Sequence, residues 1–480
     1  MRYYYGWRST NVEEGEVHYD SLPHTQYITR THLVKDFKLP EFYNNLIVSE
    51  ELDNILQSVK SQVEDGVAFE FSSRLRKQEL PIETLEDESQ MENILANGVI
   101  NQINRILLAN LSLNTLPHLL EADVDFDPRR EAFWFVGGMY PSSRTVKSKE
   151  NTGWLKEYAN DPVDIPFHYT GSPVLQLRHQ HPLKEIIPLS ESENGAFDVP
   201  TFKYDPRTLG YRFKRKPAAT IPGFWPGDPS EFGILSYHNR GHLLKKLKDA
   251  DYNFEALAVQ AILASYTWLF SQACYQGFST FHDVTYPLTT QTIITNGQWW
   301  SFCAYQLNTV VLHSDNAENN PRRNICWITE PMKLFDKIEN NKVCGLNEDT
   351  LKTLLKFYIN TPQERSGINM KPYLGENVKK IADYEDPEKR DWLEKTYKHL
   401  VSNRPRHRRI PEIDHWQKIY LIDHKTRPLD KKFYKWQFGE TISSRRLNDH
   451  AAPYIPKNIR ADPRRKQKER FAKQFYPDVN

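Results

Sequence analysis

The fold is decided by two neighbouring stretches, YNFEALAVQAILASYTWLFSQACYQGF at residues 252–278 and PLTTQTIITNGQWWSFCAYQLNTVVL at residues 287–312. The first is apolar almost all round a helical wheel, which is typical of a helix buried on every side. In the second, Asn296 and Gly297 separate two runs rich in Thr, Ile, Trp, Phe and Tyr, which predicts a hairpin closed by a two-residue type I′ turn. A long buried helix followed by an antiparallel hairpin favours an α+β fold, with a mixed or antiparallel sheet and packed helices.

Residues 252–278 are also long enough to span a membrane, so a membrane-associated adaptor is an alternative function. Polar residues such as Glu255, Gln260 and Gln272 interrupt the apolar run, and lysines flank only its N-terminal end. A central buried helix therefore explains this stretch better than a transmembrane span.

Amphipathic patterns predict three further helices, at residues 49–63, 88–111 and 386–401. The apolar face of the first contains Leu52, Ile55, Leu56, Val59 and Val63, and that of the second contains Met91, Ile94, Leu95, Ile103 and Ile106. Between residues 112 and 230 the sequence is rich in Pro with short apolar runs, which indicates short strands joined by ordered loops.

Positive charge is concentrated at the C-terminal end. The chain of 480 residues holds 63 Lys and Arg against 62 Asp and Glu, yet residues 401–480 hold 20 against 9. The first 400 residues therefore hold 43 basic against 53 acidic residues. The acidic part repels a polyanion and the basic part attracts one, which favours a nucleic-acid partner for the C-terminal segment.

The candidate phosphate contacts in this segment form basic clusters interleaved with aromatic residues. They are Arg404, Arg406, Arg408, Arg409, Lys431, Lys432, Lys435, Arg445, Arg446, Arg464, Arg465, Lys466, Lys468 and Arg470. Tyr434 and Trp436 lie within the second cluster and are candidates for stacking on unpaired bases. The alternatives are a solvated basic arm, or an arm that docks on the acidic part of its own chain.

Catalytic and cofactor signals are weak. The four cysteines are too far apart for a C-x-x-C pair, so a reducing compartment and no zinc knuckle are expected. His238 and His242 stand at helical i, i+4 spacing, but the segment lacks the Glu of H-E-x-x-H, and Gly241 weakens a helix. No phosphate-binding glycine motif or nucleophile elbow occurs. We expect no enzyme activity, cofactor or metal; a matrix enzyme using His238 and His242 is the alternative.

A resemblance to a known family becomes visible from the buried helix onward. The segments ACYQGF (273–278), ITNGQWWSFCAYQLNT (294–309) and ENNPRRNICWITEPMKLFDKIENNKVCGLNEDTLKTLLKFYINTP (318–362) resemble, in this order, the animal mitochondrial ribosomal protein family called programmed cell death protein nine. That family was first named as a small-subunit component, but its members belong to the large subunit. Arg322 and Arg323 in NNPRR are further candidate rRNA contacts; a simple surface turn is the alternative.

The resemblance implies a structural constituent of the mitochondrial large ribosomal subunit that supports mitochondrial translation in the matrix without catalysis. It implies contacts with large-subunit rRNA and other mitoribosomal proteins, including a heterodimer with a paralogous large-subunit protein. No membrane span and no catalytic residue are expected from it.

The chain is expected to divide into three parts. Residues 1–120 form a mostly helical N-terminal region, residues 121–362 an α+β core, and residues 363–480 a basic C-terminal extension. The opening letters MRYYYGWRST resemble an internal position of the family, downstream of a removed presequence. Vertebrate members end near the segment that matches YINTP, so the extension favours an invertebrate member. Both ends are predicted to be long and irregular.

Overall fold

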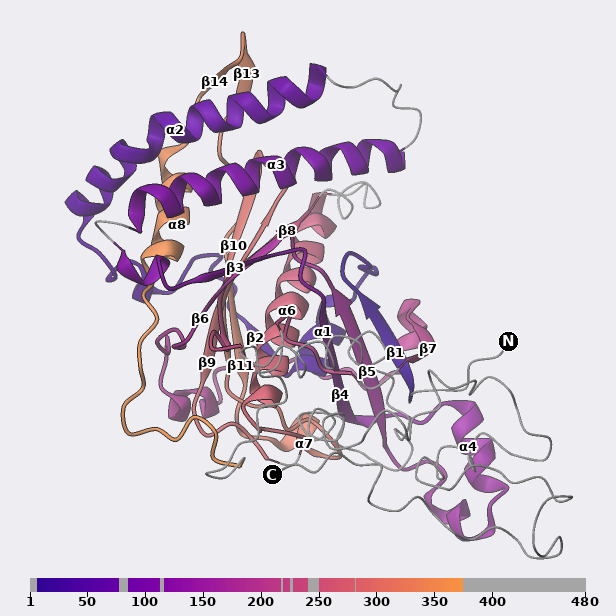
Figure 1. Ribbon diagram of the computed structural model, residues 1–480. Helices are drawn as coiled ribbons and strands as arrows, with labels where there is room; N and C mark the ends of the chain where they lie inside the picture. The colour runs from indigo at the N-terminus through magenta and orange to yellow at the C-terminus, as the bar shows by residue number, and fades with distance from the viewer. Residues whose placement is uncertain are drawn as a thin grey trace, which may run out of the picture.

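A long buried helix, α6 (Ala250–Tyr275), stands between two β-sheets (Figure 1). The computed structural model describes residues 7–76, 85–112, 116–216, 219–224, 228–240, 250–280 and 282–373. The side chains of α6 from Ala256 to Cys274 are buried, and both sheets contribute to the hydrophobic cluster around the helix. The prediction of a central buried helix is therefore confirmed.

The larger sheet has the strand order β2-β11-β10-β9-β8-β6-β3, with β12 paired to β10. The strands are β2 (Thr31–Leu33), β3 (Asp123–Phe126), β6 (Leu175–His179), β8 (Phe232–Asn239), β9 (Leu288–Thr295), β10 (Trp299–Leu307), β11 (Asn324–Ile328) and β12 (Met332–Lys333). The pairs β2–β11 and β8–β9 are parallel, whereas the other pairs in this order are antiparallel. The sheet is therefore mixed.

The hairpin of β9 and β10 forms as predicted, but its turn differs from the predicted type I′. The last strand pair is Thr295 with Trp300, so four residues form the loop rather than two. Only Gly297 has positive φ, at 94°, whereas a type I′ turn needs two such residues. The Asn296 side chain explains the difference, because its Oδ1 accepts hydrogen bonds from the backbone N–H groups of Gln298 (3.2 Å) and Trp299 (2.8 Å).

Alternation along β10 assigns its side chains to two separate cores. Cys303 and Tyr305 point to the cluster around α6, while Phe302 and Ala304 point to the cluster on the opposite face. Some polar residues of α6 bond to the strands they face: Ser265 shares a hydrogen bond with Thr292 at 2.8 Å, and Gln272 Oε1 accepts the N–H of Gly233 at 2.9 Å. These polar groups therefore form contacts between the helix and the large sheet.

Three helices cover the opposite face of the large sheet: α2 (Ser49–Arg76), α3 (Leu85–Leu111) and α8 (Glu348–Ile359) (Figure 1). In α2, Leu52, Leu56, Val59 and Val63 are buried as predicted and Ile55 is partly buried. The prediction for Ile94 on α3 is wrong, because 45% of that residue is exposed. Ile103 and Ile106 are buried as predicted, and Ala96, Val99, Ile100 and Leu107 complete the buried face of α3.

The smaller sheet has the order β4-β5-β1-β7 and lies on the other side of α6. Its strands are β1 (Trp7–Glu13), β4 (Arg130–Met139), β5 (Val163–Gly171) and β7 (Arg212–Lys216). The β1–β5 pair is parallel and the other two are antiparallel. Trp134 of β4 packs against Phe167 of β5 and Tyr266 of α6, with ring centroids 5.7 and 5.6 Å apart, so aromatic contacts join this sheet to the helix.

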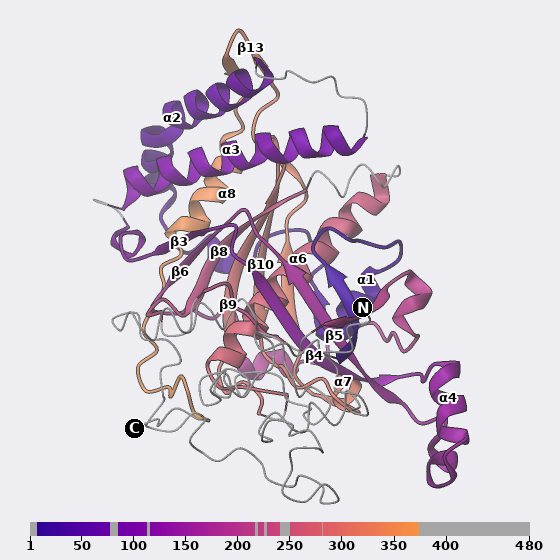
Figure 2. The same ribbon diagram turned by 45° about the vertical axis from the view of Figure 1, so that its right-hand side comes forward.

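The remaining elements are short. They are α1 (Leu22–Thr29), α4 (Ser143–Glu150), α7 (Asn316–Asn319), the hairpin of β13 (Lys337–Glu339) and β14 (Lys342–Cys344), and 3-10 turns η1 (Glu41–Tyr43), η2 (Pro117–Leu119), η3 (Gly153–Tyr158), η4 (Leu189–Glu193) and η5 (Pro206–Leu209). Helix α4 projects away from the sheets at the lower right of Figure 2.

The predicted fold class, α+β with mixed sheets and packed helices, is confirmed. The division at residues 120 and 362 stays a prediction. Two strands of the N-terminal region belong to the sheets, because β1 pairs with β5 and β2 pairs with β11. The helix predicted at residues 386–401 and most of the predicted C-terminal extension lie outside the described residues.

Candidate nucleic-acid interface

The loop between α7 and β11, which contains NNPRR, is held by side-chain amides. Asn324 is fully buried, and its Oδ1 accepts hydrogen bonds from the N–H groups of Asn308 (2.7 Å) and Thr309 (3.0 Å). Asn324 Nδ2 donates to the carbonyl of Thr29 at 2.8 Å, and Asn320 Nδ2 donates to Thr309 Oγ1 at 2.7 Å. A buried amide that satisfies three backbone groups fixes the loop in one conformation.

Arg322 is partly engaged inside the protein. Its Nη1 donates to the carbonyl of Val284 at 2.8 Å and lies 3.5 Å from Asp283 Oδ2. Its Nε lies 3.5 Å from Glu193 Oε1, and 27% of its side chain remains exposed. Because a guanidinium carries five N–H donors, Arg322 can anchor the loop through Nη1 and Nε and still offer a donor from its exposed part.

Arg323 and Arg30 bring further positive charge to this loop. Arg323 Nη1 donates to the carbonyls of Glu193 (3.2 Å) and Pro321. Arg30 is 4% exposed, and its Nε donates to the carbonyl of Arg322 at 2.8 Å. Burial, together with the neighbouring charge of Arg323, lowers the pKa of Arg30 to about 10. Arg30 is engaged inside the protein, because its guanidinium also donates to the carbonyls of Ala317, Glu318 and Asn320.

Acidic side chains balance part of this charge. Asp283 receives hydrogen bonds from the N–H groups of Val310 and Val284, both within 2.9 Å, and from the hydroxyl of Thr309. Burial raises the pKa of Asp283 more than these hydrogen bonds and the charge of Arg322 lower it. The loop is thus a mixed surface, and Arg322 and Arg323 stay proposed rRNA contacts.

The positions of the other predicted rRNA contacts relative to this loop are not described. The basic residues from Arg404 to Arg470 and the stacking candidates Tyr434 and Trp436 all lie outside the described residues. The structure therefore brings together only Arg322 and Arg323 from the predicted set.

His238 does not have the helical geometry that a metal pair with His242 requires. It lies on strand β8, is 1% exposed, and its Nδ1 contacts Glu14 Oε1 while its Nε2 lies 3.1 Å from Ser236 Oγ. His242 lies outside the described residues. Among the described residues no group of three or more His, Cys, Asp or Glu is arranged to hold a metal ion. The contact with Glu14 joins the two sheets, which is a structural role.

The apolar stretch at residues 252–278 forms α6, which lies inside the fold. Within the described ranges, no helix is both long and apolar enough to cross a bilayer. Helix α6 is enclosed by its own sheets, so its apolar surface is used within the fold.

Comparison with known families agrees with the resemblance in the sequence. The family described as mitochondrial 28S ribosomal protein S30 (PDCD9) matches residues 1–362. The chain belongs to this family. Membership in a mitochondrial ribosomal protein family locates the protein in the mitochondrial matrix. The match includes the complete described fold up to α8 and ends close to the predicted start of the C-terminal extension.

One exposed segment, the connection between β4 and β5, contains no motif that marks it as functional in the sequence. It contains α4, in which no residue is buried. Its basic residues are interspersed with Ser, Thr and Glu, so charge alone does not separate it from an ordinary solvated loop. The available signal was the capping pattern at Ser142, combined with an unusually long connection between two strands that pair directly.

Proposed function

We propose that this protein is a structural constituent of the large subunit of the mitochondrial ribosome and supports mitochondrial translation without catalysis. The observation that carries the proposal is the family match over residues 1–362. The family description refers to a 28S particle, whereas the sequence resemblance implies the large subunit. The two assignments make different predictions in a subunit separation.

Contacts with large-subunit rRNA follow from the charge distribution. The 20 basic residues among positions 401–480 are available to neutralise phosphates, while the first 400 residues carry an acidic excess. Arg322 and Arg323 add two guanidinium groups next to buried Arg30. We propose that the extension supplies most of the rRNA affinity and that the NNPRR loop adds a positioning contact.

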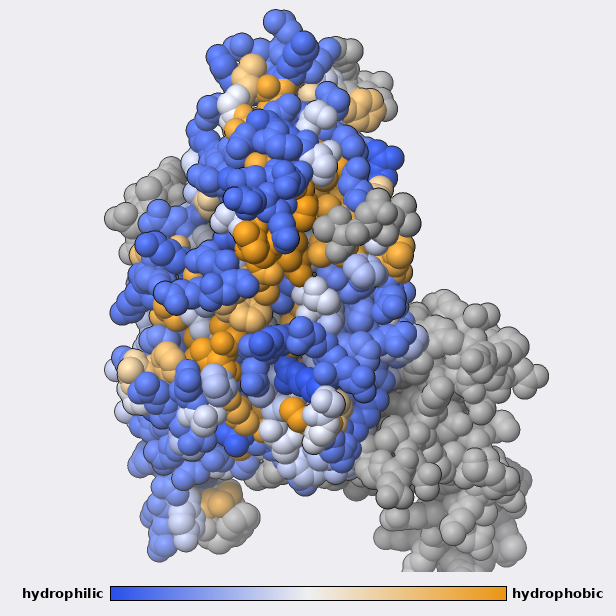
Figure 3. Space-filling view, turned by 90° about the vertical axis from the view of Figure 1, so that its left-hand side faces the viewer, coloured by the Kyte–Doolittle hydropathy of each residue, from blue (hydrophilic) through white to orange (hydrophobic). Residues whose placement is uncertain are grey.

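Contacts with protein neighbours are supported by the surface of the folded part. Figure 3 shows hydrophobic side chains running as a band between hydrophilic areas on one face of the molecule. Large apolar residues are exposed at Val48 (63%), Leu120 (61%) and Phe126 (63%). Exposed apolar residues and a charge-mixed surface suit packing between subunits, including the proposed heterodimer with a paralogous large-subunit protein.

Sedimentation in sucrose gradients tests the assignment. With magnesium present and after its chelation, the protein is expected to follow the large-subunit rRNA, because a structural constituent stays with its subunit when the subunits separate. The measurement is an immunoblot of gradient fractions from solubilised mitochondria, with both rRNAs quantified. Movement with the small-subunit rRNA contradicts the large-subunit proposal, and protein that remains at the top contradicts any ribosomal role.

Neutralising one basic cluster is expected to weaken rRNA binding in a salt-dependent manner. With Arg404, Arg406, Arg408 and Arg409 all replaced by Gln in the full-length chain, release from the particle should occur at lower salt. The slope of log affinity against log salt should fall by about 3, because each lost phosphate contact removes about 0.7 to 0.9. Release is measured by salt washes followed by pelleting.

The matched control replaces the same four arginines with Lys. It preserves charge, so the salt slope should stay close to that of the unmodified protein. Equal release of the Gln and unmodified chains would show that this cluster does not contact rRNA.

A further inference from the structure

Strands β4 and β5 are joined by a connection that is far longer than their pairing requires. They are antiparallel neighbours, with Met139 opposite Val163, yet residues 140–162 separate these two positions. A hairpin of this kind needs as few as two loop residues. Long connections in a packed domain are usually functional, so residues 140–162 require an explanation beyond the fold.

The projecting segment maintains its shape through its own hydrogen bonds. Ser142 caps α4, because its Oγ accepts the N–H of Thr145 at 3.2 Å. Thr152 Oγ1 donates to the carbonyl of Ser148 at 3.0 Å, and Lys149 Nζ donates to the carbonyl of Tyr158 at 2.8 Å. No residue of α4 is buried, so this helix contributes nothing to either hydrophobic core. We call residues 140–158 the α4 arm.

One face of the α4 arm presents positive charge to solvent. Arg144 and Lys147 are both exposed and stand three residues apart, so they lie on the same side of the helix. Neither makes an ion pair with any residue in the part of the chain that the structure describes, unlike the exposed Lys337, which pairs with Glu339 at 2.7 Å. Two exposed cations on one side of a preformed helix are available to bind neighbouring phosphates.

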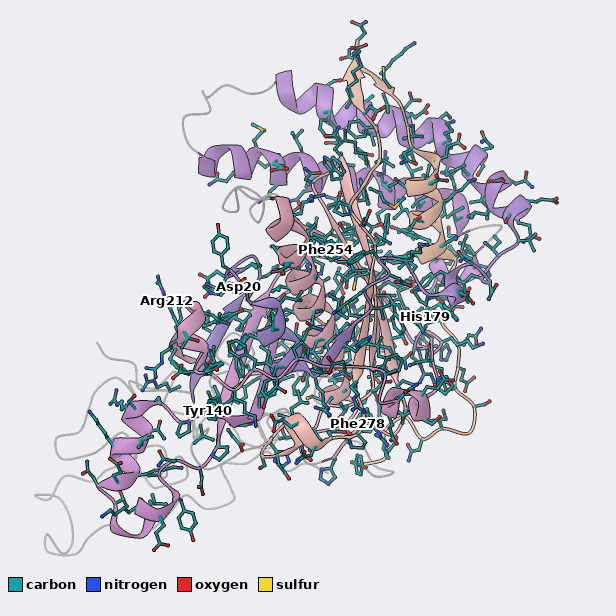
Figure 4. The ribbon with its side chains drawn as sticks, turned by 180° about the vertical axis from the view of Figure 1, so that it is seen from behind. Asp20, Tyr140, His179, Arg212, Phe254 and Phe278 are labelled. Carbon is teal, nitrogen blue, oxygen red and sulfur yellow. The ribbon has the colours of Figure 1, made fainter. Side chains whose placement is uncertain are left out.

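Exposed aromatic rings lie where the α4 arm leaves the body. The ring centroids of Tyr140 and Tyr204 are 5.9 Å apart, and 53% and 61% of these residues are exposed. The N–H of Tyr140 donates to the carbonyl of Lys203 at 2.8 Å, which ties the two loops together. Figure 4 shows Tyr140 at the junction between the projecting segment and the sheets. Tyr140 belongs to the arm that carries these cations, and together with Tyr204 it provides the stacking surface that unpaired bases need.

We propose that the α4 arm is a second rRNA contact, in which Arg144 and Lys147 bind phosphates and the pair Tyr140 and Tyr204 stacks on an unpaired base. The inference rests on the proposed ribosomal function and adds a site on the folded part of the chain. A protein neighbour with an acidic surface is the competing occupant. The aromatic pair favours RNA, because an acidic protein surface offers no unpaired base to these rings.

Ultraviolet crosslinking of native particles tests this contact. Purified ribosomal particles are irradiated and digested, and peptides bearing nucleotides are identified by mass spectrometry. The expected result is a nucleotide adduct on the peptide that contains Tyr140 or on the one that contains Tyr204. If the protein co-sediments with large-subunit rRNA but the arm crosslinks only to protein, the inference is wrong and the proposed function stands. If the protein does not co-sediment, both the inference and the proposed function are contradicted.

A charge-reversal variant gives an independent readout. Arg144→Glu combined with Lys147→Glu, in the full-length protein, should lower the salt concentration that releases the protein and reduce the nucleotide adducts at least about tenfold, because two phosphate contacts become repulsive. The matched control reverses Lys337 and Lys342 on the β13–β14 hairpin at the opposite end of the molecule (Figure 1) and should change neither value. Equal effects of both variants, or unchanged adducts on the arm, contradict a contact at α4.

Discussion

Replacing Gly137 with Ala is expected to lower the free energy of unfolding by at least about 3 kcal/mol. A Cβ at this position would lie 1.8 Å from the carbonyl oxygen and 2.2 Å from the amide nitrogen of Ser314. Both atoms belong to the backbone, so no side-chain rotation relieves the overlap. The loop around Ser314 would have to move away from β4.

This displacement would break contacts that join three parts of the fold. The N–H of Gly137 donates to the carbonyl of Leu312 at 2.8 Å, and the hydroxyl of Tyr27 on α1 donates to the carbonyl of Gly137 at 3.2 Å. The register of β4 against β5 shifts between Val136 and Met139, which places Gly137 in a bulge. The bulge brings the backbones of β4 and the loop before α7 into direct contact, which only glycine permits.

Thermal unfolding followed by tryptophan fluorescence measures the effect. Gly137→Ala should lower the apparent melting temperature by about 5 °C or more. The matched control is Gly153→Ala on the α4 arm, where an added Cβ meets no atom within 4 Å, and its melting temperature should be unchanged. If the two variants have the same melting temperature, the close approach of β4 and Ser314 is not a feature of the folded protein.

The sequence was sufficient to predict those helices and strands whose residue pattern is local. Helix α6 and the β9–β10 hairpin were predictable because all-round apolarity and an Asn-Gly pair act over a few neighbouring residues. The prediction of a type I′ turn was wrong because the Asn296 side chain accepts hydrogen bonds from two backbone N–H groups. The preference of Asn-Gly pairs for type I′ turns does not take such side-chain bonds into account. The prediction for Ile94 was wrong because Ile94 lies on the exposed side of α3, although the helix contacts the β9–β10 turn through Glu92 on one side of it and Val99 on the other.

Pairings between strands that are far apart in the sequence could not be predicted from local hydrophobic patterns. No local feature of Trp7–Glu13 indicates that it pairs in parallel with a strand more than a hundred residues away. The same holds for the candidate interface: Arg322 and Arg323 were recognised as basic, but their bonds to Val284 and Glu193 depend on distant loops. The family resemblance was visible in the sequence because it depends on the order of residues in three segments and requires no knowledge of how the chain folds.

Glu14 forms a buried polar link between the two sheets. It follows β1 of the small sheet, and its Oε1 contacts Nδ1 of His238 on β8 of the large sheet. Its Oε2 accepts the N–H of Ser172 at 2.8 Å, and 13% of its side chain is exposed. A buried carboxylate of this kind is stabilising only while its partners remain in place.

The protonation of Glu14 determines when this link contributes to stability. Burial raises the pKa of Glu14, but the charge and hydrogen bond of His238, the N–H of Ser172 and the charge of Arg130 outweigh burial and lower the pKa from 4.5 to about 2. Because the folded-state pKa lies below the unfolded value, the contribution is complete above pH 4.5 and is lost as the pH falls toward 2. A shift of this size corresponds to about 3 kcal/mol at neutral pH.

Glu14→Gln should therefore lower the free energy of unfolding by about 3 kcal/mol at pH 7, because the amide keeps the shape but loses the charge. The difference between this variant and the unmodified protein should narrow by about 1 kcal/mol at pH 3.5, where the native carboxylate begins to lose its advantage. Urea unfolding at a series of pH values measures both quantities. Glu16→Gln makes the same chemical change at an exposed position two residues away and should have no effect at either pH. A Glu14→Gln difference that is constant from pH 7 to pH 3.5 would mean that the link between the sheets acts through shape rather than through charge.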